Sequence, residues 1–91
     1  MEITHEPDAA RYVLSDGGEF LGEVEYVLVD TTLDLVRAEV PREKRGQGLG
    51  IPLLKGTLEA IRESGGLSVT PTCPYIAKYM MKNSEFDDLR V

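Results

Sequence analysis

The chain has one cysteine, one histidine, no tryptophan and no long hydrophobic run. The single cysteine, Cys73, excludes an internal disulfide framework and is typical of a reducing compartment. No apolar stretch approaches the roughly 18 residues that a membrane-spanning helix needs. Met1 is not followed by the apolar segment of a signal peptide. We therefore expect a cytoplasmic protein without a membrane partner.

Positive charge is also scarce. The chain has 10 lysines and arginines against 16 aspartates and glutamates, so its net charge is −6. Because nucleic-acid binding needs clustered basic surface, this balance argues against nucleic acid as a partner. The local exception is Arg42, Lys44 and Arg45, which lie just before a run of glycines, where they would attract an anion. His5 has no partner at a metal-ligand spacing, so we expect no metal site.

The rest of the composition is that of an ordinary globular protein, and we expect residues 1–91 to form one small domain. Apolar alternation, turn signals and helical periodicity predict the element order β-β-β-α-β-α. We expect the strands over residues 11–15, 20–30, 33–40 and 67–71, and the helices over 48–64 and 75–82. This order gives an α+β domain: a mainly antiparallel sheet with two helices packed on it and one parallel crossover.

Two details of the strands are less regular. Residues 1–10 contain Pro7 and Asp8 and are interpreted as a short strand or arm followed by a turn. Along residues 33–40, strict alternation would place Leu35 and Arg37 on one face and Ala38 on the other. Glu39 would then lie on the face opposite Ala38, turned either to a ligand or to solvent.

A glycine loop connects the third strand to the first helix. It reads Arg45-Gly46-Gln47-Gly48-Leu49-Gly50, with glycine at alternate positions. Glycines permit unusual backbone conformations and leave peptide N–H groups uncovered, and a helix start adds a positive dipole end. Together these features suit a phosphate. The run matches neither the Walker nor the Rossmann pattern. A turn without a ligand is the alternative.

Four side chains could carry chemistry near this loop. Cys73 follows the last strand, and Pro74 favours the first helical position, so Cys73 is predicted to cap the last helix. There the helix dipole favours the thiolate, although a small buried side chain is an equal interpretation. Tyr75 and Tyr79 share a helix face, and either could protonate a leaving thiolate or be a core aromatic. Glu39 could accept a proton from an ammonium group.

Several motifs together resemble the small, single-domain members of the GNAT N-acetyltransferases. The resemblance rests on the sequences Glu-Val-Pro at 39–41, Arg-Gly-Gln-Gly-Leu-Gly at 45–50 and Pro-Thr-Cys-Pro-Tyr at 71–75, continuing through Tyr79. It implies a compact GNAT-like fold that lacks the N-terminal helices of larger GNAT enzymes. It also implies that acetyl-CoA lies between the last two strands as the co-substrate.

The resemblance further assigns roles to residues. The pyrophosphate of acetyl-CoA would meet N–H groups of the loop, and the pantetheine would pair with the strand end at Val40 and Pro41. Cys73 and Tyr79 would face the thioester. These cofactor-binding residues are Val40, Pro41, Arg45, Gly46, Gln47, Gly48, Leu49 and Gly50. One departure stands out, because the family's His-Thr-Glu-Val reads Arg37-Ala38-Glu39-Val40 here, and arginine cannot act as a base.

The sequence thus favours an acetyl-CoA-dependent N-acetyltransferase that acts on a primary amine, either a small molecule or a lysine. Glu39 or water would be the base, and Cys73 or Tyr79 would lie near the leaving thiolate. Direct transfer is favoured over an acetyl-Cys73 intermediate. The alternatives are a CoA-binding module that has reduced or no catalytic activity, consistent with Arg37, and an interaction domain in which the glycines only pack the loop.

Overall fold

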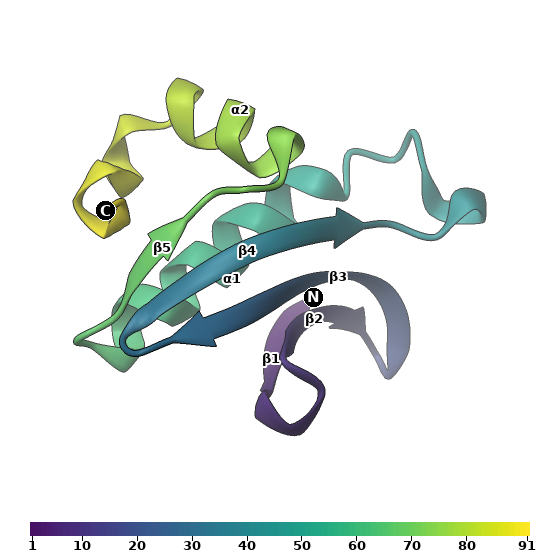
Figure 1. The fold of residues 1–91 in the computed structure, drawn as a ribbon. Helices are drawn as coiled ribbons and strands as arrows, with labels where there is room; N and C mark the ends of the chain where they lie inside the picture. Colours follow the sequence, from purple (N-terminus) through teal and green to yellow (C-terminus); the bar gives the residue numbers. More distant parts are fainter.

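The computed structural model describes all 91 residues as a five-stranded sheet with two α-helices. The strand order in space is β1-β2-β3-β4-β5, and only the β4–β5 pair is parallel. Figure 1 shows the curled sheet, with α1 behind it and α2 beside the end of β4. The strands are β1 Glu2–Glu6, β2 Arg11–Asp16, β3 Glu19–Val29, β4 Thr32–Glu39 and β5 Ser68–Thr70. The helices are α1 Gly50–Ser64 and α2 Pro74–Lys82, with 3-10 turns η1 Pro7–Ala9, η2 Arg42–Lys44 and η3 Ser84–Leu89.

The α+β class is confirmed, but the predicted order β-β-β-α-β-α is one strand short. Residues 2–6 form β1, which pairs antiparallel with β2 from Glu2 opposite Ser15 to Glu6 opposite Arg11. The segment has a single aliphatic residue, Ile3, so its alternation is too weak to distinguish a strand from an extended arm. Pairing with β2 and contact with α1 supply the order that its own sequence does not.

Helix α1 covers one face of the sheet and closes the core. Its predicted apolar stripe is buried: Leu53, Leu54, Thr57, Leu58 and Ile61 are all inaccessible. The helix begins at Gly50 rather than at residue 48 and ends at Ser64. Gly65 then takes a φ of 74°, a conformation that favours glycine and stops the helix. None of the helices is both long and apolar enough to cross a membrane.

The two ends of the chain are held to this core by aromatic and apolar side chains. His5 stacks on Tyr12, and its Nε2 shares a hydrogen bond of 2.6 Å with the Tyr26 hydroxyl. Burial raises the pKa of Tyr12 to about 12, so its phenol stays neutral. At the other end, Phe86 and Leu89 of η3 are buried in the core. His5 is therefore a locally bonded residue of the sheet.

A β-bulge in β4 changes which of its side chains face the core. Tyr26 pairs with Leu35 and Glu25 with Arg37, so Val36 is an extra residue in β4. Leu35 is buried and Ala38 packs against the same core, whereas Arg37 is exposed. The prediction of strict alternation along 33–40 was therefore wrong. The bulge turns Arg37 and Glu39 away from α1.

Strands β4 and β5 separate beyond the middle of β4. Their pairing ends at Asp34 opposite Thr70, and one more bond follows, from the Cys73 N–H to the Leu35 carbonyl at 2.9 Å. After that point β5 leads into α2 while β4 continues toward the glycine loop (Figure 1). Residues 37–39 of β4 pair only with β3. The edge that faces α2 is thus left without a strand partner.

Candidate functional site

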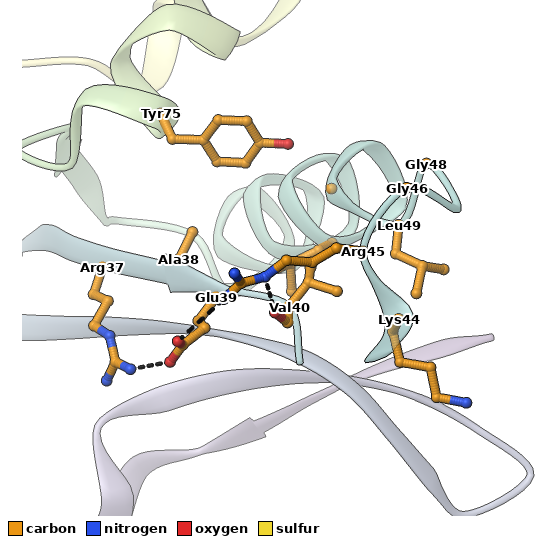
Figure 2. Close-up of a pocket in the computed structure, with 12 residues that line it drawn as sticks. Arg37, Ala38, Glu39, Val40, Lys44, Arg45, Gly46, Gly48, Leu49 and Tyr75 are labelled. Atoms are coloured by element: carbon orange, nitrogen blue, oxygen red, sulfur yellow. Dashed lines mark hydrogen bonds and ion pairs between the residues drawn. The ribbon is translucent and has the colours of Figure 1, made fainter. Parts of the chain in front are cut away.

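A pocket of about 440 Å³ lies where β4, the glycine loop and the start of α1 meet. Figure 2 shows it closed on one side by Tyr75, which reaches over from α2, and crossed by the side chain of Arg45. It therefore combines a free strand edge, a glycine loop and a helix N-terminus. The lining residues are Arg37, Ala38, Glu39, Val40, Lys44, Arg45, Gly46, Gly48, Leu49, Gly50, Leu53 and Tyr75.

The three loop glycines are required for two different reasons. Gly46 and Gly48 have φ angles of 86° and 74°, which strain any residue with a Cβ. A Cβ on either would meet nothing within 4 Å, so the backbone there faces open space. Gly50 has no positive φ. Instead, a Cβ on Gly50 would lie 1.9 Å from the Tyr75 hydroxyl oxygen, so Gly50 makes room for that side chain.

Charged side chains at the pocket are tied into one cluster around Glu39. Arg45 donates from Nε to the Val40 carbonyl at 2.9 Å, and its guanidinium lies 3.6 Å from the Glu39 carboxylate. Arg37 pairs with Glu39 from the other side and with Glu25 at 2.5 Å. Figure 2 shows the contacts of Arg37 and Arg45 with Glu39, and that of Arg45 with Val40, at the mouth of the pocket. Both Glu39 oxygens are therefore engaged by guanidinium groups, and the candidate base is not free.

Most of the residues predicted to bind the cofactor line this pocket. Val40, Arg45, Gly46, Gly48, Leu49 and Gly50 do so together with Glu39. Pro41 and Gln47 do not line the pocket. Gln47 lies in the glycine loop, and Pro41 is the N-cap residue of η2. Arg37, Ala38 and Leu53 line it without having been predicted as binding residues, whereas Lys44 was expected there only as a cation that attracts an anion. Leu53 shows only a core pattern in the sequence, because it serves both the core and the pocket floor.

Cys73 lies at the inner end of the open strand edge rather than in the pocket. It is the N-cap residue of α2, as predicted, but its side chain makes no capping hydrogen bond. The thiol is half-buried against the core. Leu35, to which Cys73 is bonded, and Val40, just beyond the end of β4, are five positions apart in the chain. At roughly 3 Å per residue this edge is about 15 Å long. Cys73 and the glycine loop therefore mark its two ends.

Tyr79 does not reach the glycine-loop pocket, whereas Tyr75 does. Tyr79 lines a groove between α1 and α2, whereas Tyr75 lines both that groove and the pocket. Burial, with smaller contributions from Glu85 and Glu59, raises the pKa of Tyr79, so its phenol keeps its proton at neutral pH. The structure therefore brings Tyr75, the tyrosine not selected from the sequence, to the glycine loop. The contact between Tyr75 and Gly50 distinguishes the two tyrosines. Their spacing in the sequence does not, because both lie on the same face of the helix.

Comparison with known proteins decides the family. Residues 11–89 match the family model described as GCN5-related N-acetyl-transferase. The chain belongs to this family. Its fold is also similar to that of a GCN5-like protein from Staphylococcus aureus, proposed to be an N-acetyltransferase, whose solution structure was determined by NMR. The TM-score is 0.71 at 26% sequence identity, over 99% of this chain and 87% of the other. A search of curated proteins gave no match.

Membership of the GCN5-related family makes acetyl transfer the expected class of reaction. It also gives meaning to Arg37, which stands where the family resemblance leads us to expect a histidine. The Arg37 guanidinium is bound to Glu25 and Glu39, and it carries no lone pair for a proton. Any base in this family member must therefore be another group.

The contact between Gly50 and Tyr75 can be tested by a double-mutant cycle. Gly50→Ala should destabilise the wild-type fold by about 1 kcal/mol, because the new methyl displaces the Tyr75 hydroxyl. In a Tyr75→Ala background, which removes the ring as well as the hydroxyl, the same change should be neutral or stabilising, since alanine favours the helix by up to about 1 kcal/mol. Urea unfolding of the four proteins measures the interaction. Additive effects of the two substitutions would show that the contact does not form.

Proposed function

We propose that the protein transfers the acetyl group of acetyl-CoA to a primary amine. The observation that carries the proposal is the continuous path formed by the free edge of β4, the open backbone over Gly46 and Gly48, and the start of α1. A long, flexible thioester with a charged end needs such a path, with hydrogen-bonding backbone along it and an anion site at one end. Membership of the family supports the same conclusion.

The residues fit the two halves of this co-substrate. Backbone N–H groups of residues 45–50, with the Arg45 guanidinium beside them, would hold the pyrophosphate. The N–H and C=O groups of residues 36–40 would pair with the pantetheine amides, as one more strand would. The open edge runs about 15 Å at roughly 3 Å per residue, which takes the thioester toward Cys73.

The chemistry then needs a neutral amine, which attacks the thioester carbonyl. A nitrogen–carbon bond forms, the carbon–sulfur bond breaks, and the amine loses a proton while the leaving thiolate gains one. Glu39 would take the amine's proton through water, because its own oxygens are engaged by Arg37 and Arg45. Cys73 lies at the thioester end and would donate to the thiolate. Tyr79 keeps its proton at neutral pH and is the second candidate donor, from the groove side.

The proposal is tested by following release of the CoA thiol with a panel of small primary amines and a lysine peptide. We expect release that depends on the amine. Incubation with acetyl-CoA alone should leave no acetyl group on Cys73 by mass spectrometry, because transfer is direct. Acetylated Cys73, together with ping-pong kinetics, would replace direct transfer with a covalent route.

A second function is favoured by the state of the candidate bases. The Glu39 carboxylate is paired with Arg37 and Arg45, and Arg37 itself cannot act as a base. A module that binds coenzyme A without turnover would need no base at either position. Binding of acetyl-CoA without release of the CoA thiol in the presence of any amine would select this function and overturn acetyl transfer.

A further inference from the structure

A second hollow, which we call the lysine groove, lies between α1 and α2. It has a volume of about 550 Å³. Ile51 and Lys55 of α1 line one wall, and Tyr75, Lys78, Tyr79 and Lys82 of α2 line the other. Lys78 and Lys82 are one helical turn apart, so both project to the same side. Three lysines thus converge on one concave surface of a protein whose net charge is −6.

These lysines differ from most of the other cations of the chain, since apart from them only Arg42 and Arg90 lack an ion pair. Arg11, Arg37, Lys44, Arg45 and Arg62 all pair with carboxylates. Lys55, Lys78 and Lys82 form no ion pair, although Glu85 also lines the groove. A solvated helix face is the simplest interpretation of Lys78 and Lys82 from the sequence alone. It does not account for Lys55, which comes from another helix and faces the same hollow. Unpaired, convergent ammonium groups form a site for a multiply charged anion.

The groove adjoins the glycine-loop pocket, and Tyr75 forms the wall that the two share. Tyr75 lines both, its hydroxyl lies over Gly50, and Ile51 is the next residue of the helix. Lys55 lies five residues beyond Gly50, about 7.5 Å along the helix axis at 1.5 Å per residue. The start of α1 and the lysines therefore form two anion sites with an exposed aromatic ring between them. That spacing suits a nucleotide whose ribose carries a pyrophosphate at one position and a single phosphate at another.

We propose that the lysine groove binds the 3′-phosphate of coenzyme A, so that this protein distinguishes coenzyme A from its 3′-dephospho form. The proposal rests on the proposed function, because it takes the pyrophosphate at the glycine loop as its starting point. From there the ribose passes the Tyr75 ring and its 3′-phosphate meets Lys55, Lys78 and Lys82. Coenzyme A carries this phosphate on its ribose, and 3′-dephospho-coenzyme A lacks it but is otherwise the same molecule.

The test is calorimetric titration of the wild-type protein with coenzyme A and with 3′-dephospho-coenzyme A. Wild type should bind coenzyme A about tenfold more tightly, and the difference should shrink as salt is added. Lys55→Gln, Lys78→Gln and Lys82→Gln should each weaken coenzyme A about twofold, so that together they account for the roughly tenfold preference, and should leave the dephospho form unchanged. Arg90→Gln is the matched control, since Arg90 is exposed, unpaired and outside the groove. It should bind both compounds as wild type does.

Each other outcome overturns a specific claim. Equal wild-type affinity for the two compounds, at any strength, removes the 3′-phosphate site and leaves acetyl transfer intact. An equal loss for both compounds in the lysine variants, or the same loss in Arg90→Gln, would reduce the effect to net charge. If neither compound binds the wild-type protein, the proposed function fails and this inference fails with it. Circular dichroism confirms that each variant is folded before it is titrated.

Discussion

Gly48→Val should lower the affinity for acetyl-CoA by about 100-fold, because the valine side chain would fill the open space above the loop and strain its backbone. Gly48 has a φ of 74°, and the direction of its missing side chain is free of protein atoms. In the proposed complex that space belongs to the pyrophosphate, and the loop N–H groups must point into it. Calorimetric titration of the variant and the wild type with acetyl-CoA measures the loss.

Gly18→Val provides the matched control for this substitution. Gly18 has a φ of 87° in the turn between β2 and β3, and a Cβ there also meets nothing within 4 Å. The two variants therefore carry similar backbone strain, and their melting temperatures should fall by similar amounts. Only Gly48→Val should lose the ligand. Equal affinities in the two variants would mean that the loop does not bind the pyrophosphate.

Arg45→Ala should weaken acetyl-CoA by about 30-fold, as expected for the loss of a charge-assisted contact to a phosphate. Arg45 lies across the pocket mouth, where it bonds to the Val40 carbonyl and faces Glu39 (Figure 2). Arg45→Lys keeps the charge but not the forked geometry, so it should recover part of the affinity. Titration at low and high salt should show a smaller salt dependence for Arg45→Ala than for wild type.

Arg42→Ala controls for the loss of a positive charge near the loop. Arg42 is three residues away, lines neither the pocket nor the lysine groove, and forms no ion pair. Its removal should change the affinity by no more than about twofold, as expected for a solvent-exposed charge that does not line the pocket. If Arg42→Ala and Arg45→Ala lose affinity equally, the loop attracts the ligand only through its general charge.

The unit from β4 to α2 could be predicted from the sequence because its local signals agree with one another. An apolar strand, alternating glycines, a helical stripe and a Gly65-Gly66 stop occur in order, and α1 begins within two residues of the predicted position. Strand β1 could not be predicted in the same way. Its order comes from pairing with β2 rather than from its own residues, since only Ile3 is a strong apolar signal.

The site was predictable only in part, because a bulge and a side-chain direction leave no local signal. Val36 looks like any alternating strand residue, yet as the extra residue of a bulge it turns Arg37 and Glu39 outward. Tyr75 and Tyr79 are equivalent on a helical wheel, and only the packing of α2 beside α1 sends Tyr75 to Gly50. Pocket residues whose place depends on local backbone conformation, such as Gly46 and Gly48, could be predicted from the sequence. Those whose place depends on tertiary packing, such as Tyr75, could not.

The central claim is that acetyl-CoA binds along the β4 edge and at the glycine loop. Backbone amide chemical shifts followed by NMR during an acetyl-CoA titration test it residue by residue, and a 91-residue protein suits the method. The account predicts that the largest shifts fall on the amides of Gly46, Gly48 and Gly50 and along residues 36–40, with little change in the β1–β2 hairpin. Shifts that cluster elsewhere, or none at millimolar ligand, would contradict it.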